Sequence, residues 1–295
     1  MEYVCSDCPR RCGVLRNTKR ISGYCRSYSL PSLVRAAPHF GEEPCISGTR
    51  GSGALFFSGC SLGCVYCQNH EISREAKGKT VDPDELGDII LRLADTGVHN
   101  INLVTASHYT RAVVKALEKI RLDIPVVWNS SGYEDPETLR MLDGLVHIYM
   151  PDIKYLRKDI AQRYSHADDY PDVVRAAVQE MFRQTGHYVI GEDGMMKKGL
   201  LIRHLMLPDA ELNTMDVIDY VSETFPEDSV VFSLMSQYTP VPGLGKWPEL
   251  ERAIDPEFNE RMCSYLNKSR IAAGYWQETA SATDEMLPAF DLTGI

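Results

Sequence analysis

LFFSGCSLGCVYCQNHEIS, residues 55–73, sets three cysteines close together with the spacing Cys60-x3-Cys64-x2-Cys67. A structural zinc ion usually takes four protein ligands, and a disulfide takes two cysteines. Three thiolates instead suit a 4Fe–4S cluster, because they leave one of its four corner irons open to an outside ligand. The stretch therefore predicts a cluster loop that directly follows a short apolar strand.

Two interpretations of this loop without catalysis stay open. A zinc ion or an ordinary four-cysteine cluster would form if Cys45 or Cys263 supplied a fourth ligand. The protein would then be a non-catalytic iron–sulfur or zinc scaffold.

Four other cysteines form a second cluster near the start of the chain: Cys5, Cys8, Cys12 and Cys25. Their spacing, C-x2-C-x3-C-x12-C, supplies four thiols, which complete a tetrahedral site without outside help. A zinc ion and an auxiliary 4Fe–4S cluster both fit this donor set. We therefore expect residues 1–28 to form a small Cys-rich metal-binding unit, with the choice of metal open.

The composition limits the partners and the location of the protein. The chain has 295 residues, 44% of them hydrophobic and 24% charged, which is enough for a sizeable core. A formal net charge of −10 argues against nucleic-acid binding through phosphate contacts. The sequence has no apolar run of transmembrane length, and its first residues lack the apolar centre of a signal peptide. We therefore expect a cytoplasmic protein with reduced thiols and no membrane partner. A nucleic-acid partner is disfavoured, although binding through one local basic patch stays open.

From residue 53 onward, short β-branched or aromatic runs alternate with amphipathic segments of helical length. The runs cover residues 53–58, 100–105, 124–129, 146–152, 199–206 and 229–235. Asp82-Pro83 and Asp135-Pro136 are typical of helix starts. This alternation predicts an α/β fold with parallel strands and crossover helices. Six repeats fall short of the eight of a closed barrel, so a partly open barrel and a doubly wound sheet both remain.

Polar segments follow the apolar runs, among them SGC after the first, TASHYT after the second and NSSGYE after the third. In both candidate folds ligands bind at the carboxyl ends of the strands, so these segments point to one shared site. We expect residues 51–245 to form the catalytic core. A connecting loop over 29–50 precedes it, in which Glu42 and Glu43 are expected in a solvated turn. A C-terminal helical segment and tail over 246–295 follow it.

The cysteine loop after the first of six predicted parallel strands resembles the radical S-adenosylmethionine (radical SAM) superfamily. The resemblance implies a (β/α)6 partial TIM barrel in which Cys60, Cys64 and Cys67 hold a 4Fe–4S cluster and SAM chelates its open iron. Reductive cleavage of SAM then gives a 5′-deoxyadenosyl radical, which abstracts a hydrogen atom from the substrate. An electron donor such as flavodoxin or ferredoxin is the implied partner.

Three further motifs resemble the PflX-like group related to pyruvate formate-lyase activating enzyme: HFGEEP (39–44), GSGALFFSGC (51–60) and CQN (67–69). This closer resemblance implies activation of a glycyl-radical enzyme, and therefore a protein substrate. The chain departs from the activases after the second strand, where TASHYT (105–110) replaces their GGE segment. Radical SAM modification of another peptide, a tRNA or a small metabolite therefore stays open.

The resemblance also implies which residues face SAM. Tyr66, before the third cysteine, is aromatic, as the family favours for contact with adenine. Lys154 is a candidate for binding the SAM carboxylate. For Ser107, capping of the following helix is the alternative role. The full implied set comprises Tyr66, Asn69, Thr105, Ser107, His108, Ser130, Ser131, Asp152, Lys154 and Arg203.

Overall fold

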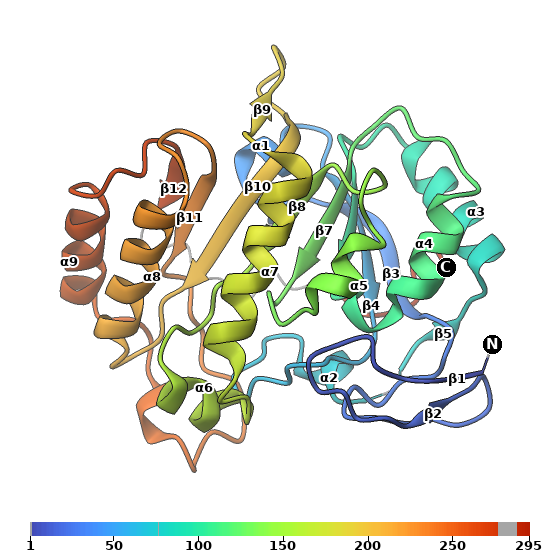
Figure 1. The fold of residues 1–295 in the computed structure, drawn as a ribbon, viewed down its shortest axis with the longest axis horizontal. Helices are drawn as coiled ribbons and strands as arrows, with labels where there is room; N and C mark the ends of the chain where they lie inside the picture. Colours follow the sequence, from blue (N-terminus) through green and yellow to red (C-terminus); the bar gives the residue numbers. More distant parts are fainter. Residues whose placement is uncertain (1, 76, 277–287) are drawn as a thin grey trace.

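The computed structural model describes residues 2–75, 77–276 and 288–295, and its centre is a ten-stranded sheet (Figure 1). Six strands coincide with the predicted runs: β4 (Ser52–Phe57), β6 (Ile101–Val104), β7 (Val126–Ser130), β8 (Ile148–Pro151), β10 (Met196–Leu205) and β11 (Val231–Met235). Each pairs in parallel with the next, in the order β4-β6-β7-β8-β10-β11. The predicted α/β fold with a mostly parallel sheet is therefore confirmed.

Shorter pairings extend the sheet at both edges. β12 (Gly274–Trp276) adds a parallel strand beside β11. At the other edge β3 (Ser32–His39) pairs antiparallel with β4, and β5 (Lys79–Thr80) pairs with β3. A two-residue strand, β9 (Val189–Ile190), pairs with the start of β10. The expectation of a loop over 29–50 is wrong for β3, whose burial depends on neighbours such as helix α3 (Pro83–Ala94) that are distant in sequence.

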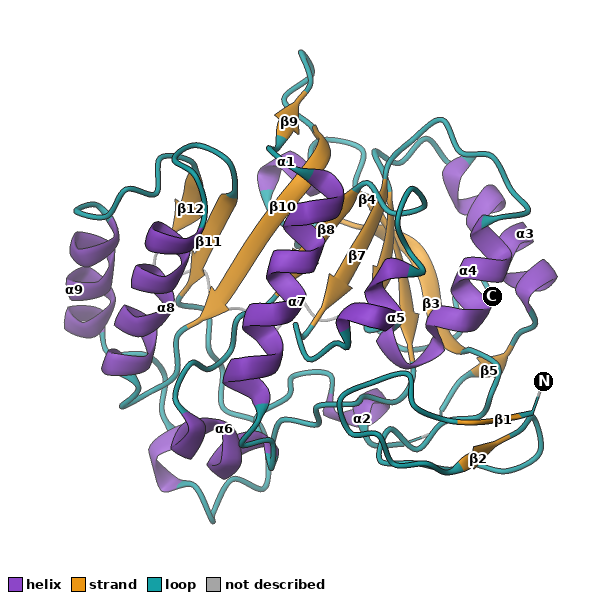
Figure 2. Ribbon diagram, viewed as in Figure 1, coloured by secondary structure: helices purple, strands orange, loops and turns teal. Residues whose placement is uncertain are grey.

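The longer connecting helices cover one face of the sheet (Figure 2). Besides α3 they are α4 (Thr110–Leu117), α5 (Pro136–Arg140), α7 (Tyr170–Thr185), α8 (Glu211–Thr224) and α9 (Pro256–Leu266). Helix α6 (Lys158–Ser165) lies beyond the strand ends toward which the arrows point. Asp82 and Asp135 cap α3 and α5 as predicted, because each carboxylate accepts hydrogen bonds from the first-turn N–H groups. A doubly wound sheet carries helices on both faces. The placement of these helices on one face therefore favours the partly open barrel. How far the sheet closes stays a prediction.

Strand alternation gives the sheet two different faces. Leu103 and Trp128 point into the large core between sheet and helices. Their strand neighbours Asn102 and Asn129 are also buried, but lie on the opposite face, where their side chains bond to Glu42. The short helix α1 (Pro44–Ser47) and its loop are attached to that second face through a hydrogen bond from Asn100 Nδ2 to the Ile46 carbonyl.

The Cys-rich unit begins with a separate two-stranded sheet, β1 (Tyr3–Val4) paired with β2 (Leu15–Arg16). In Figure 1 this sheet lies near α2 (His70–Ser73), at the end toward which the arrows of β4 and β7 point. Arg16 anchors the unit there, because its buried guanidinium donates to the carbonyls of His108 and Tyr28. No helix among the described residues is long and apolar enough to cross a membrane. Part of the expected C-terminal tail, residues 277–287, lies outside the described residues.

Candidate functional site

The three-cysteine loop begins directly after β4. Gly59 starts it with φ +88°, and a Cβ atom there would approach the Ser27 Oγ atom to 2.4 Å. Cys60 is buried, and the Gly63 N–H donates to its sulfur at 3.4 Å. Burial, reinforced by the charges of Cys64 and Cys60, raises the pKa of Cys67 to about 12. The thiols are therefore close enough to influence one another.

The donor set fits an iron–sulfur cluster. Thiolates are the ligands that such clusters take, and one short loop supplies three of them at the carboxyl end of a strand. A cationic group would offset the burial that opposes ionisation of these thiols. In the described part of the chain, no group of three or more His, Cys, Asp or Glu side chains is arranged so that it could hold a metal ion. The ligand assignments at both cysteine clusters therefore stay predictions.

Two of the four N-terminal thiols lie beside the same glycine, Gly23. A Cβ atom on Gly23 would lie 3.4 Å from the Cys12 sulfur and 3.6 Å from the Cys25 sulfur. Burial raises the pKa of Cys8 to about 12, and the other three cysteines of the unit add to the effect. Cys12 is exposed, whereas the remaining three are buried. This placement is compatible with the predicted second metal site and does not choose between zinc and iron.

A chain of charges runs from the cysteine loop across the strand ends. Lys154 Nζ donates to Asp152 Oδ2 at 2.6 Å, and Arg203 Nε donates to Asp152 Oδ1 at 2.9 Å. Burial alone would raise the pKa of Asp152, but Arg203 and Lys154 hold it below its usual value. Burial opposes the charge of Lys154, yet Asp152 and the neighbouring Cys64 raise the pKa of this ammonium group to about 12. The structure thus brings these three predicted residues together, with Lys154 beside the cysteines.

Glu42 extends this chain of charges onto the face of the sheet that carries α1. Its Oε1 atom accepts from Asn102 at 3.0 Å and from Asn129 at 3.1 Å, and its Oε2 atom accepts from Arg203 at 2.9 Å. Glu43 beside it is also buried. The expectation of a solvated turn for this pair is wrong, because the loop folds against the sheet. Polar side chains at interior positions of three predicted strands were the signal that a buried partner was needed.

Ser107 and Ser130 meet a carboxylate that the prediction missed. Glu134 is 4% exposed, and it accepts from Ser130 Oγ and from Trp128 Nε1, both at 2.7 Å. The side chain of Ser107 also hydrogen-bonds to Glu134. No side chain caps α4, so Ser107 does not take the alternative capping role there. Both serine hydroxyls are therefore committed to a protein partner on the helix side of the sheet, where Trp128 lies.

Thr105 and His108 depart from ordinary geometry at the end of β6. Thr105 has φ +63°, a left-handed conformation that is strained for a β-branched residue. His108 is buried, and its Nε2 atom lies 2.9 Å from the Ser58 carbonyl, which can only accept. The other ring nitrogen, Nδ1, is buried with no partner among the described residues. Burial and the nearby Arg16 lower the pKa of His108 to about 3, so its ring is neutral.

The other three residues predicted to contact SAM, Tyr66, Asn69 and Ser131, form hydrogen bonds within the protein. Tyr66 is buried beside three other tyrosines, and Tyr155 donates to its hydroxyl at 2.8 Å. Asn69 precedes α2 and accepts with its carbonyl from the N–H groups of Ile72 and Ser73. The Ser131 carbonyl accepts from Tyr170 at 2.7 Å.

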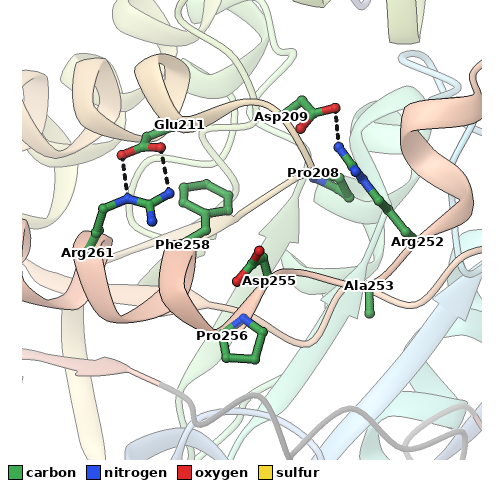
Figure 3. A pocket seen from close by; sticks show the side chains of 9 residues that line it. All are labelled: Pro208, Asp209, Glu211, Arg252, Ala253, Asp255, Pro256, Phe258 and Arg261. Carbon is green, nitrogen blue, oxygen red and sulfur yellow. Dashed lines mark hydrogen bonds and ion pairs between the residues drawn. The ribbon is translucent and has the colours of Figure 1, made fainter.

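A separate pocket lies between α8 and α9 (Figure 3). Four of its five charged side chains form ion pairs, Glu211 with Arg261 and Asp209 with Arg252, and the fifth, Asp255, caps α9. It contains none of the predicted site residues. The charge chain and the cysteine loop, and not this pocket, are therefore the candidate functional site.

Comparison with protein-family models supports the interpretation of the cysteine loop. Residues 55–193 match the model of the Radical SAM superfamily. The chain is 29% identical over 280 residues to "Uncharacterized protein MJ0674" of Methanocaldococcus jannaschii, covering 90% of this chain and 75% of that protein.

Two solved structures of SuiB from Streptococcus suis are similar to this chain at 12% sequence identity. The complex with the precursor peptide SuiA has a TM-score of 0.50 and covers 78% of this chain and 49% of SuiB. The complex with S-adenosylmethionine has a TM-score of 0.48, with 79% and 48% covered. The chain thus spans about half the length of these structures.

Proposed function

We propose that this chain, whose residues 55–193 match the model of the Radical SAM superfamily, is an enzyme that cleaves SAM reductively. When bound, a 4Fe–4S cluster would pass one electron to SAM, giving methionine and a 5′-deoxyadenosyl radical that takes a hydrogen atom from the substrate. A flavodoxin or a ferredoxin would supply the electron in the cytoplasm.

The observation that carries this proposal is the three-thiol loop after β4 inside the matched segment, with a charged lysine beside it. Cys60, Cys64 and Cys67 would hold the cluster. Lys154 would bind the SAM carboxylate with the ammonium donors that its bond to Asp152 leaves over, since an ammonium group carries three donors. Asp152 would keep Lys154 charged and in place, and Arg203 in turn fixes Asp152.

The Cys-rich unit is proposed to bind a second metal centre, which is either zinc or an auxiliary 4Fe–4S cluster. The four-thiol spacing, and the Cys12 and Cys25 sulfurs that lie beside Gly23, support the site. Both centres take four thiolates, so the donor set leaves the metal undecided.

Activation of a glycyl-radical enzyme is the first candidate reaction, because three sequence motifs resemble the activases. The strained Thr105 and the Glu134-bound Ser107 replace the GGE segment, and this observation favours a second candidate. That candidate is radical modification of another peptide or of a small metabolite. A tRNA substrate is disfavoured by the net charge of −10.

The test is anaerobic reconstitution with iron and sulfide, followed by electron paramagnetic resonance of the reduced protein with and without SAM. The proposal expects a 4Fe–4S signal that changes when SAM is added, and formation of 5′-deoxyadenosine under reducing conditions. If the resonance signal of the cluster does not change when SAM is added, and no 5′-deoxyadenosine forms, the protein is a non-catalytic scaffold.

A further inference from the structure

Side chains from outside the cysteine loop hold three successive carbonyl groups within it. Arg10 Nε donates to the Ser61 carbonyl at 3.0 Å, and Arg10 Nη2 donates to the Leu62 carbonyl at 3.1 Å. Arg74 Nη2 donates to the Gly63 carbonyl at 2.5 Å. All three carbonyls lie between the first and second cysteines of the loop.

Tyr24 joins the two arginines. The Arg10 guanidinium carbon lies 3.9 Å from the centre of the Tyr24 ring, and the Arg74 guanidinium carbon lies 5.0 Å from it. The Tyr24 hydroxyl donates to the Leu62 carbonyl at 3.3 Å and accepts from Arg74 at 3.2 Å. We call Arg10, Tyr24 and Arg74 the arginine clamp. Guanidinium groups suit this role because their donors form a rigid planar fork that also stacks on aromatic rings.

The arginine clamp also contacts the C-terminal end of helix α6. The remaining donors of Arg10 bond the carbonyls of Ser165 at 2.8 Å and His166 at 2.5 Å, at the C-terminal end of α6. One arginine therefore ties the cysteine loop to the end of a helix more than 90 residues farther along the chain.

Two of the three clamp residues belong to the Cys-rich unit. Arg10 lies between Cys8 and Cys12, and Tyr24 precedes Cys25. The unit also contacts the start of the loop, since a Cβ atom on Gly59 would approach the Cys25 carbonyl to 2.5 Å. A metal centre that holds the four N-terminal cysteines in place would therefore also hold Arg10 and Tyr24 in place.

The held carbonyls determine where the loop N–H groups point. In a trans peptide unit the carbonyl and the following N–H point in opposite directions. The carbonyls of Ser61 and Leu62 are bound by Arg10, and the N–H groups of the same peptide units, those of Leu62 and Gly63, both interact with the Cys60 sulfur. By binding these carbonyls, Arg10 orients the backbone N–H groups that face the Cys60 sulfur.

We propose that the Cys-rich unit is a positioning device for the cysteine loop, in which the arginine clamp holds N–H groups toward the Cys60 sulfur. Hydrogen bonds to cluster sulfurs and nearby positive charge both raise the reduction potential of an iron–sulfur centre. Arg10 is thus a positioning residue for the thiolate that would hold the cluster. The expected change in the reduction potential of the cluster rests on the proposed function. The expected effect of the clamp on the order of the cysteine loop does not.

The first experiment measures amide hydrogen exchange of the full-length protein before cluster loading, in the wild type, Arg10→Met and the matched control Arg20→Met. Arg20 is an exposed arginine of the same unit. Arg10→Met is expected to speed exchange at residues 60–67 at least tenfold and to leave α8 unchanged. Unchanged exchange in the loop, or an equal rise in Arg20→Met, would overturn the proposal. If Arg10→Met does not fold, Arg74→Met is assessed by the same criterion.

The second experiment measures the midpoint potential and the resonance signal of the reconstituted cluster. Arg10→Met should shift the potential to a lower value, and Arg10→Lys should recover part of the shift because it restores the charge without the fork. Potentials equal to the wild type in both variants would contradict the positioning role. If the wild type forms no SAM-responsive cluster, the proposed function fails, and the exchange result still decides the inference.

Discussion

Glu42 and Arg203 lie 161 positions apart in the sequence, and Arg203 Nη1 donates a 2.9 Å hydrogen bond to Glu42 Oε2. The Glu42 side chain is 9% exposed and that of Arg203 13%, so the pair is largely withdrawn from water. Arg203 also bonds Asn129 and Asp152. This ion pair therefore links the loop before β4 to the charge chain that leads to Lys154.

Glu42→Gln should lower the free energy of unfolding by about 1.5–3 kcal/mol, the usual worth of a hydrogen bond to a charged group. The variant leaves Arg203 with Asp152 as its remaining anionic partner, which limits the loss. Urea denaturation of the wild type and the variant measures it. The matched control is Glu118→Gln, an exposed glutamate after α4, with an expected change within about 0.5 kcal/mol. Equal small changes in both variants would contradict the structural importance of the pair.

Cys67→Ala should abolish the SAM-responsive resonance signal and the formation of 5′-deoxyadenosine, because only two thiols of the loop remain. Cys263→Ala is the control, since Cys263 lies on α9 and its sulfur contacts Asn259 at 3.7 Å. Iron analysis and the reductive cleavage assay provide the measurement. Loss of the cluster in Cys263→Ala would instead identify a fourth protein ligand and exclude an open iron.

Cys12→Ala should remove one metal centre and keep the other. Cys12 is the exposed member of the N-terminal set, so its replacement disturbs packing least. Metal analysis of the wild type should give about four irons with one zinc, or about eight irons, depending on which centre the unit holds. The variant should retain about four irons. A wild type with about four irons and no zinc would exclude the second site.

Thr105→Gly should raise stability slightly and weaken SAM binding. Relief of the left-handed strain contributes about 1–2 kcal/mol, and the greater freedom of glycine in the unfolded chain offsets about 0.4–1 kcal/mol of it. If the threonine hydroxyl contacts SAM, its loss should reduce affinity roughly 5- to 150-fold, corresponding to about 1–3 kcal/mol.

Thermal unfolding and SAM titration of cluster-loaded protein test both parts of the Thr105 prediction. Ser107→Ala is the comparison, because its hydroxyl is bound to Glu134 and its loss should cost stability more than affinity. Wild-type affinity in Thr105→Gly would remove Thr105 from the SAM site.

The sequence by itself determined the features that depend on neighbouring residues. The spacing of Cys60, Cys64 and Cys67 defined the loop. The repeated apolar runs predicted six parallel strands, and Asp82 and Asp135 marked two helix starts. Each of these signals follows from local backbone geometry or from the chemistry of one short motif, so no knowledge of distant contacts was needed.

Tertiary structure decided what each polar side chain binds. Glu42 became a buried partner of Arg203, and Glu134 took the hydroxyls of Ser107 and Ser130. Arg10 came to hold the cysteine loop from a unit about 50 residues earlier in the chain. A hydrogen bond across such separations depends on how strands and loops pack in three dimensions, and the residue types along the chain do not specify that packing one segment at a time.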